Sequence, residues 1–384
     1  GIHSCVTAAK NRFVEIMPGE KTSEETLRSA DKFAVLSGKD PIYTGDSFGC
    51  AINLFFVPWL NESVKLLQEG IDSIEIIDTV CMKTFGIGMG PFALMNATGV
   101  PISLHAQRTL EFFGPSYKVA KLLEQQVEKK ENWNIGDMSA VVVDSALEKK
   151  ISERMLGVVL FVSSQILEGN ICSAIDLNKG AKIGLKWRRG PVDLMKLYGA
   201  EEVIRLVKSY CELYDEKVPV ISSSSWKMEY VTLEKEGDRA IITMNRPEEM
   251  NSLNEEVMRM LDEKFTDADN DAAINTIFIT GTGKAFVAGA DIKFFVKNMK
   301  NKALEKIVEF TTYGQQVFEK IDKSEKKVVA ILNGMALGGG VELALCADMI
   351  LSVSKATLAF PETGIGIYPG LGGTQRTIPR VGKG

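Results

Sequence analysis

An internal repeat constrains the fold of the first half of this 384-residue chain. Gly90-Pro-x-x-Leu-Met95 recurs as Gly190-Pro-x-x-Leu-Met195, and residues 69–73 resemble residues 169–173 in the same ungapped register, at an offset of 100 residues. Such self-similarity indicates that one supersecondary unit occurs twice. The sequence therefore predicts two helical modules of similar fold that pack as a pseudo-twofold pair.

Apolar periodicity and capping residues predict the elements around this repeat. Residues 1–45 are typical of a β-α-β unit, in which Thr22 or Ser23 caps a helix that stops at Gly38. Helices are predicted next, at 51–69, 73–85, 90–98, 105–112, 117–128 and from 147 onward. A hairpin at 231–244, helices at 254–267 and 303–321, and a strand at 276–280 then predict an α/β core.

These elements divide the chain into five parts. We predict a β-α-β segment at 1–45, helical modules at 46–130 and 131–220, an interdomain linker at 221–227 and an α/β domain at 228–384.

Composition excludes several classes of function. A net charge of −5 without long basic runs argues against a nucleic-acid surface. The longest apolar run, Cys50 to Leu60, is too short to span a bilayer. Six cysteines without a C-x-x-C pair, and only two histidines, predict reduced thiols and no zinc site. We expect a cytoplasmic protein with no metal and no membrane partner.

A glycine-rich bend stands at the centre of the α/β domain. Residues 328–332 read as a buried strand, Gly338 to Gly340 as a bend, and the helix that follows carries Glu342 in its first turn. Such a bend directs peptide N–H groups and a helix dipole toward an oxyanion, and Glu362 offers a second carboxylate. This pattern indicates acid–base chemistry on a carbonyl compound. A tight turn in which Glu342 merely complements the dipole is the alternative.

The segments 284–293, 333–342 and 369–376 together resemble the crotonase (enoyl-CoA hydratase/isomerase) superfamily, over about residues 228–384. The resemblance implies an oxyanion hole made by the backbone N–H groups of Ala290 and Gly339. It places the two acid–base carboxylates at Glu342 and Glu362, and having both resembles a hydratase rather than an isomerase or hydrolase.

The same resemblance implies a coenzyme A thioester as the substrate. Lys284, Lys293 and Ala288 match the family's CoA-binding positions. Solvated surface lysines are the alternative for the two lysines. Which glutamate would activate water and which would protonate the α-carbon stays open.

The first half resembles the 3-hydroxyacyl-CoA dehydrogenase family. His3 and Glu15 stand at the twelve-residue spacing of that family's catalytic dyad, and Asn53 matches its substrate-contacting asparagine. The repeated Gly-Pro segments match the duplicated helical modules of fused, multifunctional members. Two features depart from the family: Ser4-Cys-Val-Thr7 replaces Phe-Phe-Asn-Pro, and the glycine-rich dinucleotide loop is missing from the sequence before His3.

We therefore expect a multidomain chain that is the central part of a fused dehydrogenase–hydratase. Its fold class would be a remnant of a Rossmann domain, an all-α dehydrogenase C-terminal domain and a truncated α/β crotonase domain. The full-length parent would bind NAD and acyl-CoA and form a homo-oligomer, whereas this chain would not bind NAD. Two alternatives remain, a crotonase-fold isomerase and a non-catalytic helical oligomerisation module fused to a degraded crotonase domain.

Overall fold

The computed structural model describes residues 1–5, 8–47, 49–139 and 141–382. The chain divides into two compact units, Gly1–Met228 and Glu229–Gly384. Among the described helices, none combines the length and apolar composition that a membrane crossing requires.

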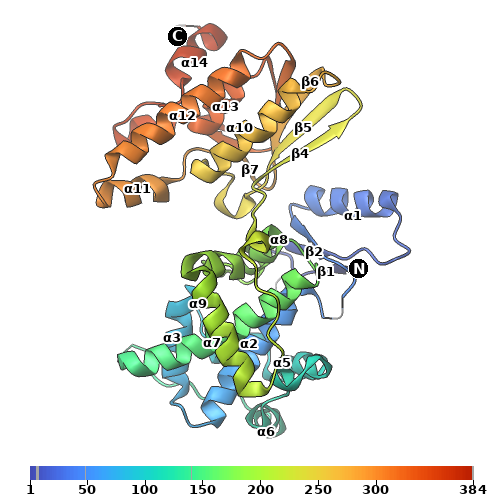
Figure 1. Cartoon of the computed structure of the whole chain (residues 1–384), viewed down its shortest axis with the longest axis vertical. Helices are drawn as coiled ribbons and strands as arrows, with labels where there is room; N and C mark the ends of the chain where they lie inside the picture. The colour runs from blue at the N-terminus through green and yellow to red at the C-terminus, as the bar shows by residue number, and fades with distance from the viewer. Residues whose placement is uncertain (6–7, 48, 140, 383–384) are drawn as a thin grey trace. The chain divides into compact units, whose positions relative to one another are not determined.

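A three-stranded sheet opens the first unit (Figure 1). β1 (Ile2–His3) pairs antiparallel with β2 (Phe13–Ile16), which pairs parallel with β3 (Asp40–Tyr43). Helix α1 (Glu24–Leu36) packs against β2 and β3, and the Ser23 side chain caps it by accepting from Thr26 N. The register of β1 and β2 sets His3 directly opposite Glu15.

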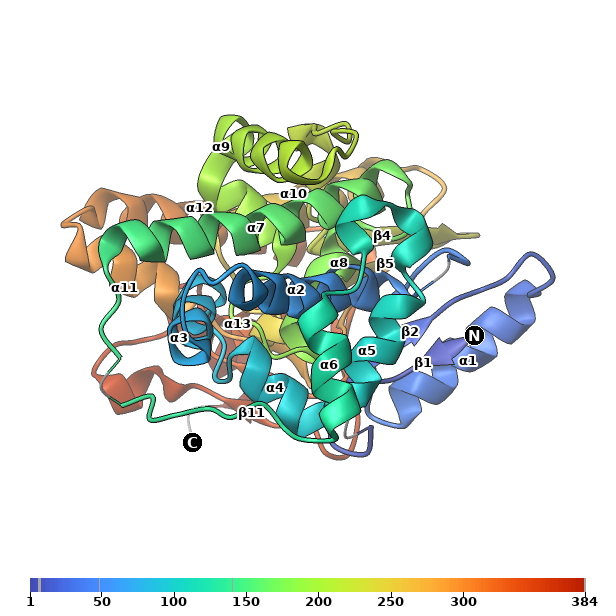
Figure 2. The ribbon, with the colours of Figure 1, turned by 90° about the horizontal axis from the view of Figure 1, so that it is seen from below.

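Helices form the rest of this unit. The first set comprises α2 (Ala51–Gln68), α3 (Ile74–Phe85), α4 (Pro91–Thr98), α5 (Val100–Arg108), η1 (Glu111–Phe113), η2 (Pro115–Tyr117) and α6 (Lys121–Lys129). The second comprises α7 (Ser145–Glu168), α8 (Ala174–Lys179), the π-helical turn η3 (Gly180–Gly184) and α9 (Pro191–Tyr214). Helix α7 packs against both α2 and α9 and lies between them in Figure 2.

The bounds predicted for one helix are wrong. The helix predicted at 105–112 begins instead at Val100 and ends at Arg108, where α5 gives way to η1. Pro101 explains the early start, because its fixed φ angle suits the first turn of a helix.

The two sets of helices share one capping device at equivalent positions. The Asp78 carboxylate accepts hydrogen bonds from the amides of Phe92 and Ala93, at 2.9 and 3.1 Å. One hundred residues later, Asn178 Oδ1 accepts from the amides of Val192 and Asp193, at 2.9 and 3.3 Å. Each side chain thus satisfies the first amides of the helix that begins with a Gly-Pro pair.

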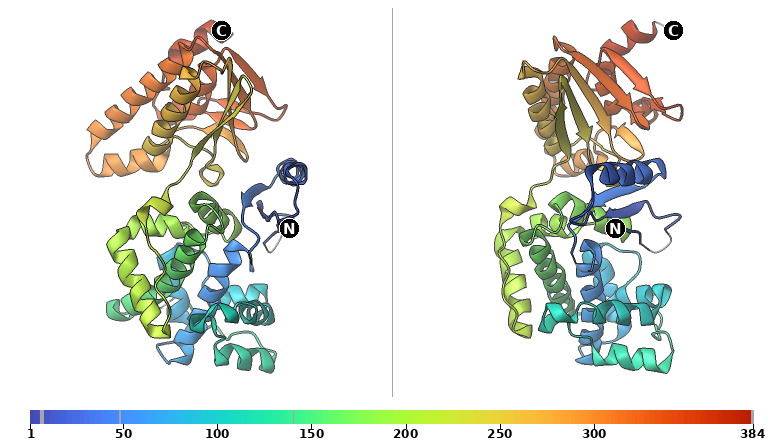
Figure 3. Two further views of the ribbon diagram at one scale, coloured as in Figure 1. Left: turned by 45° about the vertical axis from the view of Figure 1, so that its right-hand side comes forward. Right: turned by 90° about the vertical axis from the view of Figure 1, so that its right-hand side faces the viewer.

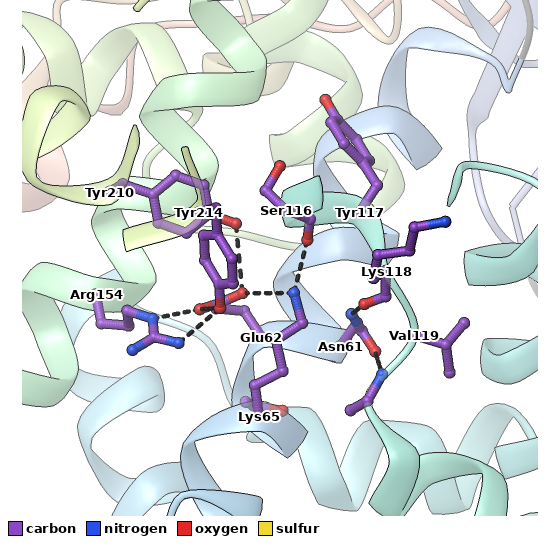
Figure 4. A network of polar contacts seen from close by, with 12 residues as sticks. Asn61, Glu62, Lys65, Ser116, Tyr117, Lys118, Val119, Arg154, Tyr210 and Tyr214 are labelled. Atoms are coloured by element: carbon purple, nitrogen blue, oxygen red, sulfur yellow. Dashed lines mark hydrogen bonds and ion pairs between the residues drawn. The ribbon is translucent and has the colours of Figure 1, made fainter. Parts of the chain in front are cut away.

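A buried ion network joins α2, α7 and α9 (Figure 4). The Glu62 side chain is fully buried, and its carboxylate contacts Arg154 and accepts from the Tyr214 hydroxyl at 2.7 Å. Lys65 Nζ lies 3.6 Å from the other carboxylate oxygen and donates to Ser116 O at 2.6 Å. Arg154 also donates to Glu69 at 2.9 Å. Two anions and two cations therefore balance one another, with Glu62 in the interior and Glu69 at its exposed edge.

The second unit contains two sheets (Figure 3). The larger has the order β10-β8-β6-β5-β4, from β4 (Val231–Glu236), β5 (Arg239–Met244), β6 (Thr276–Gly281), β8 (Lys327–Leu332) and β10 (Met349–Ser352). Its strands are parallel except for the β4–β5 hairpin. The smaller sheet, order β11-β9-β7, is parallel and consists of β7 (Ala285–Ala288), β9 (Met335–Leu337) and β11 (Leu358–Ala359).

Helices cover both sheets. Helix α10 (Glu255–Asn270) packs on β4 and β5 and against α12 (Leu304–Asp322), which in turn contacts α11 (Ile292–Lys300). Helix α13 (Gly339–Leu345) packs on β7 and β9 and contacts α14 (Gly373–Val381). The smaller sheet therefore positions the start of α13.

The predicted linker at 221–227 is more ordered than its serine content indicates. Ser223–Trp226 form the 3-10 helix η4, which packs against α9. The Trp226 side chain is buried, so the burial of its ring fixes this segment to the helical unit.

Candidate active sites

The glycine bend brings two backbone amides together at the start of α13. Gly338 has a φ of +47°, which favours glycine, and Gly339 is the first residue of the helix. Ala290 forms a parallel bridge with Leu253, whose two hydrogen bonds use the amides of Leu253 and Asp291. The Ala290 amide is thus not used by the hydrogen bonds of this bridge. Ala290 N lies 3.8 Å from the position that a Cβ on Gly339 would occupy. Two amides can converge on one oxygen here.

A buried ion pair fixes the loop that carries Ala290. Arg246 Nη1 lies 3.1 Å from Asp291 Oδ2, and the guanidinium also lies over the Tyr230 ring. Asp291 caps α11 through a bond from Lys293 N. The loop is therefore tied to both the β5 end and α11, which limits movement of the Ala290 amide.

Two carboxylates approach the same helix start. Glu342 lies in the first turn of α13, is 2% exposed, and its Oε1 accepts from the amides of Leu371 and Gly373 at 2.7 and 2.8 Å. The Glu362 carboxylate lies against Gly338, because a Cβ on that glycine would come 2.1 Å from Glu362 Oε1. Oε2 of Glu362 is buried and has no hydrogen-bond partner among the described residues. One carboxylate is thus fixed by amides and the other has an oxygen free to bind a ligand.

The charge of Glu362 affects the pKa of Glu342. Burial raises the pKa of Glu342, the nearby charge of Glu362 raises it further, and the bonds from Gly373 and Leu371 oppose the shift. A carboxyl whose pKa is raised by burial keeps its proton to a higher pH than an exposed one. Glu342 is therefore a candidate for acid–base chemistry at this helix start.

The positions matched to CoA binding have unequal surroundings. Ala288 ends β7 and its amide donates to Met250 O at 3.0 Å. Lys284 is exposed, just before β7. Lys293, in the first turn of α11, donates to Glu249 Oε2 at 2.7 Å. The Lys293 side chain in that pair is 68% exposed, whereas the Glu249 side chain is 19% exposed.

His3 and Glu15 form a hydrogen-bonded pair in the first unit. His3 Nδ1 lies 3.0 Å from Glu15 Oε2, and Glu15 Oε1 accepts from Ala51 N at 2.7 Å. Glu15 is fully buried, whereas the His3 side chain is 26% exposed. The carboxylate thus orients the ring and at the same time holds the start of α2. Asn53 lies in the first turn of that helix and is half-buried.

Cys50 is a residue at this site that the sequence reasoning missed. A ring nitrogen of His3, a carboxylate oxygen of Glu15 and Cys50 Sγ lie within 4.8 Å of one another. Hydrogen bonds with Cys50 and then with Glu15 raise the pKa of His3 to about 10. The available signal was the position of Cys50, three residues before Asn53 at the predicted helix start.

Comparisons with known proteins match both halves of the chain. Residues 49–134 match the family model "3-hydroxyacyl-CoA dehydrogenase, C-terminal domain", and residues 234–384 match "Enoyl-CoA hydratase/isomerase". A crotonyl-CoA hydratase of Syntrophomonas wolfei is 45% identical over 157 residues, which are 41% of this chain and 59% of that protein. A short-chain-enoyl-CoA hydratase of Clostridium acetobutylicum is 42% identical over 155 residues, 40% of this chain and 58% of that protein.

A solved structure is also similar to the second unit. The enoyl-CoA hydratase of Thermoplasma volcanium shares 36% sequence identity, with 41% of this chain and 61% of that chain covered and a TM-score of 0.38. The chain spans less than two thirds of the length of these relatives. The two family matches thus show a helical segment similar to the 3-hydroxyacyl-CoA dehydrogenase C-terminal domain, followed by an α/β segment similar to the enoyl-CoA hydratase/isomerase family.

Proposed function

We propose that the second unit carries an enoyl-CoA hydratase site for short enoyl-CoA thioesters of the crotonyl-CoA type. The observation that supports this proposal is the approach of Glu342 and Glu362 to the start of α13, beside the Ala290 and Gly339 amides. The relatives named as crotonyl-CoA and short-chain-enoyl-CoA hydratases favour this substrate class.

The proposed reaction adds water across a double bond conjugated to a thioester. Water attacks the β-carbon, the electron pair of the double bond moves toward the carbonyl, and negative charge develops on the thioester oxygen. The Ala290 and Gly339 amides would stabilise that charge, and one such donor is typically worth about 3 kcal/mol. One glutamate takes the proton of the water while the other delivers a proton to the α-carbon.

The test is hydration of crotonyl-CoA by the full-length product of the gene. Glu342→Gln and Glu362→Gln should each lower kcat about a hundredfold or more with little change in thioester binding, because the shape is kept and a proton carrier is lost. Glu305→Gln is the matched control, since Glu305 lies in the first turn of α12 and is exposed. Full activity in both active-site variants would refute the proposal.

The same assay separates hydration from isomerisation. In water labelled with heavy oxygen, hydration places the label in the product. Conversion of substrate without uptake of label would favour the isomerase alternative.

We also propose that His3 and Glu15 serve the oxidation of 3-hydroxyacyl-CoA to 3-oxoacyl-CoA in the full-length product, with Asn53 contacting the substrate. In the described residues, neither β-α turn of this sheet has the glycine-rich loop that binds a dinucleotide pyrophosphate. The part assigned to His3 is exchange of the 3-hydroxyl proton, with Glu15 holding the ring.

The dehydrogenase proposal has its own test. In the full-length product with NAD, His3→Gln should lower oxidation about a hundredfold, and Glu342→Gln should leave it unchanged, because the two sites use different residues. Equal loss of oxidation in both variants would contradict two separate sites.

A further inference from the structure

A thiol lies beside the His3–Glu15 pair, and neither proposed reaction uses it. His3 is hydrogen-bonded to Glu15, and a ring nitrogen of His3, a carboxylate oxygen of Glu15 and the Cys50 sulfur lie within 4.8 Å of one another. A nucleophile, a base in contact with it and a carboxylate that orients the base are the parts of a cysteine-dependent acyl-transfer site. The three groups in the first unit therefore suit a reaction other than the oxidation proposed for His3 and Glu15.

The backbone and the exposure of Cys50 suit this role. Cys50 has a φ of +57°, an unfavourable angle for a residue with a side chain, at the turn that leads into α2. Strained residues of this kind are concentrated at functional sites. Cys50 is half-buried, as is Cys5, whereas Cys81, Cys172, Cys211 and Cys346 are buried.

Cys5, by contrast, lies in a setting that suppresses reactivity. Burial, followed by the charge of Glu15, raises the pKa of the Cys5 thiol to about 12. The thiolate is the reactive form of cysteine. Cys5 therefore provides an internal comparison for Cys50 in the same part of the chain.

A metal ion is a weaker account of the same three groups. Both Glu15 oxygens already accept hydrogen bonds or ion-pair contacts, Oε2 from His3 at 3.0 Å and Oε1 from Ala51 N at 2.7 Å. Both Glu15 oxygens are thus engaged by protein groups, so this cluster offers a metal ion only one thiol and one imidazole as ligands. Zinc sites use three or four protein ligands.

We propose that Cys50, His3 and Glu15 form a thiol-nucleophile triad that accepts an acyl group from an acyl-CoA thioester. The choice of acyl-CoA as the electrophile rests on the proposed function of this unit. Cys50 and His3 are the catalytic residues, and Glu15 is a positioning residue that acts through the His3 ring.

The step balances without a further reactant. The Cys50 thiol gives its proton to His3, and the sulfur electron pair forms a bond to the thioester carbonyl carbon. The carbonyl carbon–sulfur bond to CoA then breaks, and the CoA sulfur takes the proton from His3. The products are S-acyl-Cys50 and free CoA thiol.

The experiment incubates the 384-residue chain with acetyl-CoA and maps acyl groups by peptide mass spectrometry. Acetyl-CoA is saturated and has no 3-hydroxyl group, so neither hydration nor oxidation can consume it. The expected result is acetylation of Cys50 that neutral hydroxylamine reverses. Cys50→Ala should abolish it, His3→Gln should reduce its rate at least about tenfold, and Cys5→Ala should leave it unchanged.

Alkylation tests the thiol independently of acyl-CoA. With limiting iodoacetamide at neutral pH, Cys50 should react at least about tenfold faster than Cys5. Circular dichroism and tryptophan fluorescence confirm that each variant is folded. If Cys50→Ala fails to fold, the His3→Gln comparison still decides, because it keeps the thiol and removes the base.

The role of Glu15 requires a readout that a purely structural role would not change. The titratable groups around the ring are Glu15 on β2, Cys50 at the start of α2, Cys5 after β1, and Lys186, which follows η3 and acts on Cys5. Glu15→Gln should slow Cys50 alkylation and change its pH profile, because the His3 ring loses the carboxylate that orients it. An unchanged profile in a folded variant would overturn the positioning role.

Three results would overturn the triad. They are absence of acyl-Cys50, acylation only of lysines in a hydroxylamine-resistant form, and alkylation of Cys50 only after treatment with a chelator, which would identify Cys50 as a metal ligand. Crotonyl-CoA hydration by Glu342 and Glu362 is measured on the same protein. Failure of the triad can thus be told apart from failure of the proposed function.

Discussion

Replacing Arg154 with methionine should destabilise the helical unit by about 3 kcal/mol. The arginine contacts the fully buried Glu62 and the half-exposed Glu69, and its own side chain is 13% exposed. Removing one partner of a buried pair costs 3–5 kcal/mol, because a buried charge stays behind. Lys65 still lies 3.6 Å from Glu62 and keeps one positive charge there, so we take the lower end of that range.

The assay is urea denaturation of the 384-residue chain, followed by tryptophan fluorescence. All four tryptophans, at 59, 133, 187 and 226, belong to the first unit. The signal therefore reports unfolding of the helical unit alone. Arg154→Lys separates charge from geometry and should lose about half as much stability, because a single ammonium group cannot reach both glutamates.

Arg205→Met supplies the matched control. Arg205 lies on α9 and pairs with Glu153 and Glu202 at 2.5 and 2.6 Å, but its side chain is 48% exposed. Exposed pairs contribute about 1 kcal/mol or less. If Arg154→Met and Arg205→Met lower the unfolding free energy equally, the interior network in Figure 4 contributes no more than a surface pair, and the reasoning is refuted.

Four further predictions concern protonation and the repeat. Burial raises the pKa of Asp78 from 3.8 to about 6. The free energy that Asp78 contributes to folding is therefore complete below pH 3.8 and is lost as the pH rises through 6, a loss of at most about 3 kcal/mol. Urea titrations at several pH values should show that Asp78→Asn removes most of this pH dependence. Oxidation of 3-hydroxyacyl-CoA should rise with pH toward the His3 pKa of about 10, and a midpoint at its ordinary value of 6.5 would contradict this assignment. Burial raises the pKa of Glu342, so the ionised carboxylate lowers the stability of the fold above that pKa. Glu342→Gln should therefore slow hydrogen exchange in β8 at neutral pH, and the variant and the unaltered chain should exchange equally below about pH 4.3. In a crystal structure, residues 69–95 should superpose on 169–195 by a rotation near twofold, and unrelated chain paths would contradict a duplication.

Local signals in the sequence predicted much of the fold. Helix α3 begins after Ser73 and ends at Gly86, and both residues carry capping signals that depend only on neighbouring residues. The hairpin predicted at 231–244 is confirmed as β4–β5, and it turns at Gly237, because glycine favours its φ of +60°. The strands of the smaller sheet, two to four residues long, are too short for an alternating pattern, and the sequence did not indicate them.

The candidate sites could be predicted only where their residues are close in sequence or match a family motif. His3 and Glu15 are twelve residues apart, and the antiparallel register of two short strands brings them together. Glu342 and the Gly373 amide are 31 residues apart, and their contact depends on the packing of α14 on α13. The Ala51 amide donates to Glu15, and this tertiary contact places the neighbouring Cys50 beside His3. No local sequence pattern indicates such a contact.

The matched caps of the two helical sets also bear on the order of folding. The contacts from Asp78 to Phe92 and from Asn178 to Val192 each close a loop of 14 residues. Short loops cost little chain entropy and close early. A chain emerging from the ribosome can therefore form the Asp78 cap before residue 178 has been synthesised. The Glu62–Arg154 contact joins residues 92 positions apart and cannot form until α7 has been synthesised. Docking of α7 on α2, rather than formation of either cap, would then limit the rate at which the helical unit folds.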